Sequence, residues 1–162
     1  MKLTTKILEL LQQDATLTHK TIAAMTASTE EEVSAIVDQL TRDGVILGYT
    51  AKINSEKSPI HMVEAMIEVK VSPQRELGYN DIARRIYKFP EVEAVYLMSG
   101  SYDLSVKIQA PTMQAISTFV WEKLAVLDGV TGTATLFIMR KYKENGTILV
   151  EDEQEERLVI TP

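Results

Sequence analysis

Apolar positions repeat with helical spacing in the first third of the chain. Apolar residues at positions 7, 8, 10 and 11 predict a helix over residues 5–13. Ile22, Ala23 and Met25 predict a second helix that starts at Thr18. The two helices are separated by a short polar turn, so we expect them to pack against each other.

A third helix carries its own start and stop signals. Thr29 and Glu32 have the T-x-x-E spacing of a capping box, in which each side chain accepts from the other residue's backbone N–H. Apolar positions 33, 36, 37 and 40 then form one stripe, and Gly44 suits a left-handed C-terminal cap. The β-branched residues 45–49 predict a strand or wing that leads into residues 50–53. Residues 1–51 are therefore predicted to form a winged helix-turn-helix.

The periodicity changes after residues 52–63, which we interpret as a hinge strand and linker. Residues 64–71 alternate apolar and polar side chains, as a half-buried strand does. A helical apolar face follows from Tyr79 to Phe89 and is stopped by Pro90. Residues 92–98 predict the second strand.

Two further strands and a helix complete this pattern. The turn at residues 99–103 joins the second strand to an alternating third strand, so the two should pair antiparallel. Pro111 and Thr112 start a helix that Asp128 and Gly129 close, and residues 133–142 predict the last strand. The order over residues 64–143 is β-α-β-β-α-β, which predicts an α+β ferredoxin-like sandwich with two helices on one sheet face.

The other face of this sheet is predicted to be open. Met66, Phe137 and Met139 are assigned to its outward register, and such an apolar face needs a cover. A symmetric homodimer supplies one, since the same surface is used twice.

Residues 144–162 are predicted to extend beyond the sandwich. The Asn145-Gly146 pair favours a tight hairpin turn, so residues 147–150 can return as an extra strand. Five of the six residues at 151–156 are acidic, and we expect the tail to be disordered.

Composition places the chain among soluble globular proteins. The 162 residues are 45% hydrophobic and 25% charged. No apolar run approaches the roughly 20 residues of a membrane span, and the polar N-terminus does not resemble a signal peptide, so we expect a cytoplasmic protein with no membrane partner. Because cysteine is absent and His19 and His61 stand far apart, the sequence predicts no disulfide and no metal site.

Charge complicates the prediction of a DNA-binding head. The formal net charge is −6. Residues 1–51 carry four basic and seven acidic side chains, so the head itself is acidic. Proteins that bind nucleic acid normally gain their non-specific affinity from a basic face.

Four segments in order resemble the Lrp/AsnC (feast/famine) family of transcriptional regulators, along essentially the whole chain. They are KILELLQQDATLTHKTIAAMT, DGVILGYTAKIN, VYLMSGSYDLSVKI and LDGVTGTATLFIMRKYK. The glycine-aromatic-aspartate turn and the G-V-x-x-x-x-T approach to the last strand are the more specific pieces. The resemblance implies a C-terminal sandwich of the type called a RAM domain. It further implies homodimers that assemble to tetramers or octamers, DNA on the outside, and a free amino acid bound between dimers.

The resemblance also places the effector at the turn between the second and third strands. Its candidate residues there, with two weaker candidates from the last strand, are Ser99, Gly100, Ser101, Tyr102, Asp103, Thr133 and Thr135. Gly100 and Ser101 can donate to an α-carboxylate, and Asp103 can accept from an α-ammonium. The alternative is structural: Gly100 allows a positive φ and Asp103 caps its own turn. Short side chains around Tyr102 suggest a small or aliphatic effector such as alanine or leucine, and no other cofactor is expected.

The predicted recognition helix departs from the family pattern. Relatives carry arginine or lysine in its second turn, where this chain has Ala35, Ile36, Asp38 and Gln39. Double-stranded promoter DNA can still be bound by hydroxyls, by cationic anchors and by a glutamate that accepts from cytosine N4, with many weak heads acting together. The candidates are Lys20, Ser28, Thr29, Glu30, Ser34, Arg42 and Lys52.

Two alternatives stand beside DNA binding. The chain can be an amino-acid-sensing oligomer that has weakened or lost DNA binding and contacts other proteins through the acidic face. An enzyme is the other alternative, but the sequence contains no nucleophile–base pair, phosphate loop or acid–base couple that argues for one. We therefore expect a regulator of amino-acid metabolism.

Overall fold

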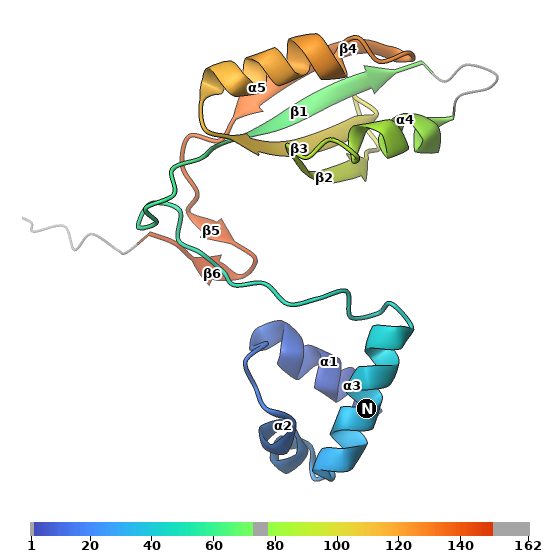
Figure 1. Ribbon diagram of the computed structural model, residues 1–162, viewed down its shortest axis with the longest axis vertical. Coiled ribbons are helices and arrows are strands. Elements are labelled where there is room, and N and C mark those ends of the chain that lie inside the picture. The colour runs from blue at the N-terminus through green and yellow to red at the C-terminus, as the bar shows by residue number, and fades with distance from the viewer. Residues whose placement is uncertain (1, 73–77, 151–162) are drawn as a thin grey trace, which may run out of the picture. The chain divides into compact units, whose positions relative to one another are not determined.

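The computed structural model describes residues 2–72 and 78–150, and the chain divides into two compact units at residues 53/54. The first unit contains three helices and the second contains the sheet (Figure 1). No helix in the described ranges is long and apolar enough to cross a membrane. The disorder expected for residues 151–162 lies outside the described residues.

The first unit confirms the three predicted helices. They are α1 (Leu3–Gln13), α2 (His19–Thr26) and α3 (Glu30–Arg42). The Thr18 hydroxyl accepts from the backbone N–H of Thr21, which caps α2. A small core holds the helices together, with fully buried Ile7, Ile22 and Val33 at its centre.

Both ends of α3 are closed as the sequence predicts. At the start, the Thr29 hydroxyl accepts from the Glu32 N–H at 3.2 Å, and the Glu32 carboxylate accepts from the Thr29 N–H at 3.1 Å. At the end, Gly44 has a φ of 68° and the Val45 N–H donates to the Leu40 carbonyl at 2.9 Å. A left-handed residue at this position leads the chain off the helix with its last carbonyls bonded.

The predicted strand at residues 45–49 is wrong. Residues 46–53 have no regular secondary structure, and no described strand pairs with them. Only Ile46 packs into the helical core, whereas Leu47 is 92% exposed. A β-branched run becomes a strand only where a neighbouring strand accepts its backbone hydrogen bonds, so composition alone misled the prediction.

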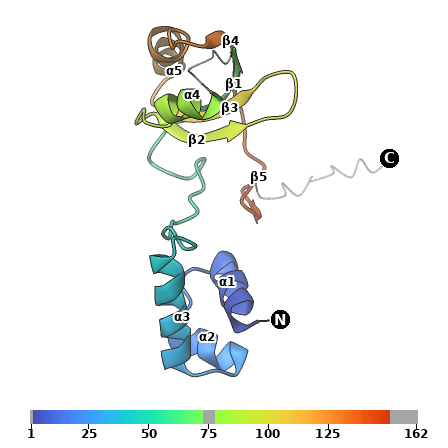
Figure 2. The same ribbon diagram turned by 90° about the vertical axis from the view of Figure 1, so that its right-hand side faces the viewer.

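The second unit confirms the predicted β-α-β-β-α-β order. Its strands are β1 (Val63–Val71), β2 (Val92–Leu97), β3 (Leu104–Ala110) and β4 (Val130–Phe137). They form one antiparallel sheet in the order β2-β3-β1-β4. Helices α4 (Tyr79–Ile86) and α5 (Met113–Phe119) cover one face of it, and α5 continues as a π-helical turn, η1 (Val120–Leu124) (Figures 1 and 2).

The core lies between this face and the two helices. The inward residues of β1, which are Ala65, Ile67, Val69 and Val71, are buried against side chains such as Ile82 of α4 and Ile116 of α5. Phe89 and Phe119 meet edge to face at 5.5 Å. Lys123 of η1 hydrogen-bonds Glu91, and this bond outweighs partial burial and holds the pKa of Glu91 below its usual value.

The last strand lies earlier in the chain than the predicted residues 133–142. Strand β4 ends at Phe137. In its register with β1, Phe137 pairs with buried Ala65, and Leu136 pairs with outward-facing Met66. Phe137 therefore packs on the core side, and its predicted position on the open face is wrong. Leu136, which is 52% exposed, lies on the open face instead. Met139 lies beyond β4 and is 82% exposed. A shift of one residue moves every side chain of a strand to the other face.

The predicted hairpin after β4 is present but short. Strands β5 (Lys143–Glu144) and β6 (Thr147–Ile148) pair around a turn in which Asn145 and Gly146 have φ values of 46° and 80°. Two positive φ angles in a row are the geometry that an Asn-Gly pair favours. The returning strand ends at Ile148 instead of position 150.

Gly129 is expected to be the least replaceable glycine of the second unit. Its φ is +90°, and an added Cβ would lie 2.7 Å from Cδ1 of fully buried Ile82. Gly129→Ala should therefore combine backbone strain with overpacking and lower the free energy of unfolding by about 2–4 kcal/mol. Urea denaturation of the full chain measures this loss.

The matched control is Gly146→Ala. Gly146 has a similar φ of +80°, but an added Cβ would meet nothing within 4 Å. This variant should lose only the strain, about 1–2 kcal/mol. Equal losses for the two variants would contradict a packing role for Gly129.

Candidate functional site

The exposed side of α3 and the start of α2 form a hollow in the first unit. His19, Glu30, Glu31 and Ser34 line it together with Ala35 and Asp38, and its volume is about 460 Å³. Of the predicted DNA-binding residues, Glu30 and Ser34 are brought together here. The sequence analysis had not assigned His19 to this surface.

The other predicted DNA contacts of this unit are spread or already engaged. The Thr29 hydroxyl is used in the helix cap, and the Ser28 hydroxyl shares a hydrogen bond with Thr26 at 2.7 Å. Arg42 lies in the last turn of α3, where it donates to Gln39 at 2.9 Å. Lys20 lies in the first turn of α2 and is exposed, and Lys52 is exposed beyond the helical core. Cations therefore flank an acidic helix face at separate points.

A second cavity lies on the open face of the sheet, where β1, β4 and the turn at residues 99–103 meet. Its volume is about 300 Å³. The residues that line it are Glu68, Lys70, Ser101, Tyr102, Gly132, Thr133 and Ala134. Three predicted effector residues, Ser101, Tyr102 and Thr133, thus line the cavity, although Thr133 does so from a register position opposite buried Val69.

Glu68 and Lys70 are the functional candidates that the sequence analysis missed. They are two positions apart on β1 and both face away from the core, since Ile67, Val69 and Val71 point inward. A carboxylate and an ammonium side by side offer complementary partners for the two charged groups of a free amino acid. Both residues stand at the polar positions of the alternating segment 64–71, where the sequence displays them directly. That alternation served only to predict the strand.

The structure gives Asp103 a different environment. Its Oδ2 accepts from the backbone N–H of Val71 at 2.9 Å, and its Oδ1 accepts from the Tyr79 hydroxyl at 3.5 Å. Its own N–H donates to the Val69 carbonyl at 3.1 Å. These bonds tie the turn to the end of β1, where the pairing with β4 shifts register at Lys70/Val71. Asp103 therefore supports the cavity from outside its lining.

Three further predicted effector residues are also outside the lining. Ser99 and Gly100 belong to the same turn but do not line the cavity. Gly100 does not have a positive φ, so the structural explanation offered for it does not hold. Thr135 pairs with buried Ile67 and therefore shares its helix-covered face. Among the described residues, no group of three or more His, Asp or Glu side chains is arranged to hold a metal.

Comparison with known proteins gives a family match for each of the two units. Residues 64–148 match the family model described as the Lrp/AsnC ligand binding domain, and residues 2–46 match a winged helix-turn-helix DNA-binding model. The HTH-type transcriptional regulator YugG of Bacillus subtilis is 45% identical over the whole of both chains. The HTH-type transcriptional regulator FL11 of Pyrococcus furiosus is 30% identical, covering 90% of this chain and 93% of its own.

A solved structure extends the likeness to the fold. The transcriptional regulator NMB0573 of Neisseria meningitidis, crystallised as an L-Met complex, superimposes with a TM-score of 0.72. It is 25% identical, and the match covers 89% of this chain and 92% of that one. The relatives are named as regulators and not as enzymes, as the sequence predicted. The chain therefore belongs to the Lrp/AsnC family and is a DNA-binding transcriptional regulator with an amino-acid-binding domain.

Proposed function

We propose that this regulator controls genes of amino-acid metabolism and responds to an amino acid bound in the cavity between β1, β4 and the turn at residues 99–103. The observation that carries the proposal is that Glu68 and Lys70 both line that cavity. The α-ammonium of the effector would face Glu68, and its α-carboxylate would face Lys70 and Ser101. Both charged groups of the ligand would then be matched.

The side chain of the effector would lie against Tyr102. A volume of about 300 Å³ lined by Gly132 and Ala134 suits a small or aliphatic side chain, such as that of alanine or leucine. The similar Neisseria regulator was crystallised with L-Met, which supports an apolar side chain. We include methionine among the candidates for that reason.

The working form would be a homodimer that assembles to a tetramer or octamer. On the open sheet face, Leu136 and Tyr96 are 52% and 53% exposed. Half-buried Met66 lies beside Leu136, and Ser105 and Lys107 of β3 separate it from Tyr96. Exposed apolar side chains of this kind are stabilised when a second copy covers them. The cavity lies on the same face, so a neighbouring dimer would close over the bound amino acid.

DNA binding by each head would be weak, and firm binding would depend on several heads being joined in one oligomer. The acidic first turn of α3 repels phosphates, so the cations Lys20, Arg42 and Lys52 would have to anchor the backbone. Heads joined in one oligomer raise one another's effective concentration at the DNA. The oligomer would then hold DNA that a single head releases.

A second candidate function follows from the same helix. Glu30, Glu31 and Asp38 form an acidic surface around a hollow that a basic segment of another protein would complement. The chain would then sense amino acids and act through that protein. Retardation of promoter DNA separates this candidate from the first.

The effector site is tested by thermal unfolding of the full chain against the twenty amino acids. The correct effector, at about one hundred times its Kd, should raise the Tm by roughly 5–10 °C, because it binds only the folded state. Glu68→Gln should abolish this rise without lowering the basal Tm. Glu122→Gln is the matched control, since Glu122 is exposed on η1 and does not line the cavity.

Asp103→Asn gives the complementary result. Because Asp103 bonds the end of β1, its loss should lower the basal Tm while part of the ligand-induced rise remains. A full response in Glu68→Gln, combined with none in folded Asp103→Asn, would overturn the assignment of Glu68 and favour Asp103.

DNA binding is tested by electrophoretic retardation of the chain's own promoter region at several salt concentrations. Affinity should fall steeply with salt, and replacing Lys20, Arg42 and Lys52 by glutamine should reduce the slope by about one for each lost phosphate contact. The matched triple variant replaces Arg84, Lys88 and Lys143, which are exposed in the second unit, and should keep the slope. Absence of retardation at low salt, with and without the effector, would exclude the first function.

A further inference from the structure

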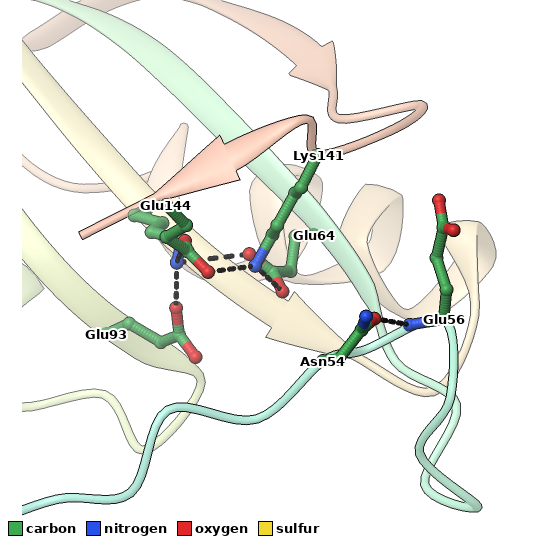
Figure 3. Close-up of polar contacts among 7 residues, drawn as sticks. Asn54, Glu56, Glu64, Glu93, Lys141 and Glu144 are labelled. Atoms are coloured by element: carbon green, nitrogen blue, oxygen red, sulfur yellow. Dashed lines mark hydrogen bonds and ion pairs between the residues drawn. The ribbon is translucent and has the colours of Figure 1, made fainter. Parts of the chain in front are cut away.

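Five charged side chains meet on the open face of the sheet, beside the start of β1. Glu64 comes from β1, Glu93 lies at the bulge of β2, Lys141 follows β4 and Glu144 lies on β5 (Figure 3). The fifth residue, Lys107, comes from β3. We call these five residues the latch. None of them lines the cavity between β1, β4 and the turn at residues 99–103.

Every member of the latch contacts an oppositely charged group. Lys107 Nζ lies 3.0 Å from Glu64, 2.9 Å from Glu93 and 3.3 Å from Glu144. Lys141 Nζ lies 2.5 Å from Glu64 and 3.0 Å from Glu144. Both lysines therefore join a carboxylate of the sheet to the carboxylate of the hairpin.

The latch is partly shielded from water. The side chains of Glu64 and Lys141 are only 12% and 15% exposed. Burial alone lowers the pKa of Lys107, but hydrogen bonds to Glu93 and Glu64 outweigh it and hold that pKa above the ordinary lysine value. A hydrogen bond from Lys141 likewise holds the pKa of Glu144 below its usual value. At neutral pH these groups stay charged, and salt screens such a network less than surface pairs.

The segment that carries Lys141 and Glu144 also holds the entry to the second unit. We call residues 139–149 the strap. The Asn54 side-chain amide donates to the Leu149 carbonyl at 2.9 Å, and Arg140 Nε donates to Glu56 at 3.0 Å. Asn54 Oδ1 in turn accepts from the Glu56 N–H at 3.0 Å (Figure 3). Latch, strap and residues 54–56 thus form one connected set of polar contacts.

These contacts fix where the connection between the two units ends. Ile46 is the last residue buried in the helical core, and Asn54 is bonded to the strap. The eight Cα–Cα steps from Ile46 to Asn54 span at most about 28 Å when extended. Regular structure of the second unit begins at Val63 of β1, and when the strap is released we take that residue as the end of the connection. The connection then has sixteen residues and spans up to roughly 55–60 Å.

We propose that Lys107, Lys141 and Glu144 are positioning residues that set the reach of the head by latching the strap over residues 54–56. A closed latch keeps the connection short, so the heads of one oligomer engage only DNA segments at a narrow range of separations. An open latch widens that range and lowers the effective concentration of one head at its own site, because the accessible volume grows with length. The DNA part of this proposal rests on the proposed function; the mechanical part does not.

The mechanical part is tested on the full chain with spin labels. Since the chain has no cysteine, Gln12→Cys and Gln114→Cys place one label on α1 and one on α5. Labelled chains diluted into unlabelled ones report distances within one chain. Lys141→Met should widen the distance distribution about 1.5-fold, as expected from the longer connection. Amide hydrogen exchange at Glu56 should rise about tenfold in the same variant.

Control variants separate the latch from general effects of charge and stability. Lys143→Met removes the same charge from the neighbouring exposed position and should leave both readouts unchanged. Lys141→Arg should restore the wild-type distribution. If Lys141→Met does not fold, Asn54→Ala removes the bond to the strap, together with the local bond from the Glu56 N–H, and should widen the distribution in the same way.

DNA with two binding sites at increasing separation supplies the second measurement. The wild type should bind best over a narrow range of separations, and Lys141→Met should bind nearly equally over a broad one. Unchanged label distances in folded Lys141→Met and Asn54→Ala, or equal widening in Lys143→Met, would overturn the proposal. Widened distances with no DNA binding by any variant would support the latch and refute the proposed function instead.

Discussion

The second unit depends on the alternation of β1, the strand that pairs with both β3 and β4. Its inward side chains, such as Ile67 and Val69, are fully buried under α4 and α5 and provide the hydrophobic contacts that hold the sandwich together. Because successive strand residues point to opposite faces, this burial forces Glu64, Glu68 and Lys70 onto the open face. The positions of the proposed effector cavity and of the proposed latch are thus both consequences of where the core lies.

Local signals were sufficient for most of the fold. The capping box at Thr29, the left-handed Gly44 and the Asn145-Gly146 turn each act over a few residues, so the sequence displays them directly. Non-local pairing was not visible in the same way. The face of Phe137 follows from its pairing with Ala65, and the run at residues 45–49 has no strand to pair with. In both cases the deciding contact lies far away in the chain.

The candidate site was likewise predictable from local sequence features but not from its long-range contacts. The family resemblance pointed to the turn at residues 99–103, and two of its side chains, Ser101 and Tyr102, do line the cavity. The charged lining on β1 was missed because the turn was considered apart from the strand beside it. Asp103 shows the converse. Its carboxylate was assigned to the effector's α-ammonium or to its own turn, but it accepts from the backbone N–H of Val71, which lies 32 residues away in sequence. Residue type suggested a ligand contact where tertiary structure supplies a bond.

The acidic charge of the head and the proposed latch both bear on how strongly the protein holds DNA. A helix that opens with Glu30, Glu31 and Glu32 gains a good cap and a favourable interaction with its own dipole, and the same charges weaken its attraction to a polyanion. In the proposed function, affinity then comes from joining heads in one oligomer, and joining is effective only when the connection length suits the separation of the sites. A long connection spreads each head over a large volume, whereas a short one concentrates it at few separations. Weak heads therefore make the anchoring at Asn54 matter more than it would for a strongly basic head, whose single-site affinity would tolerate a loose connection.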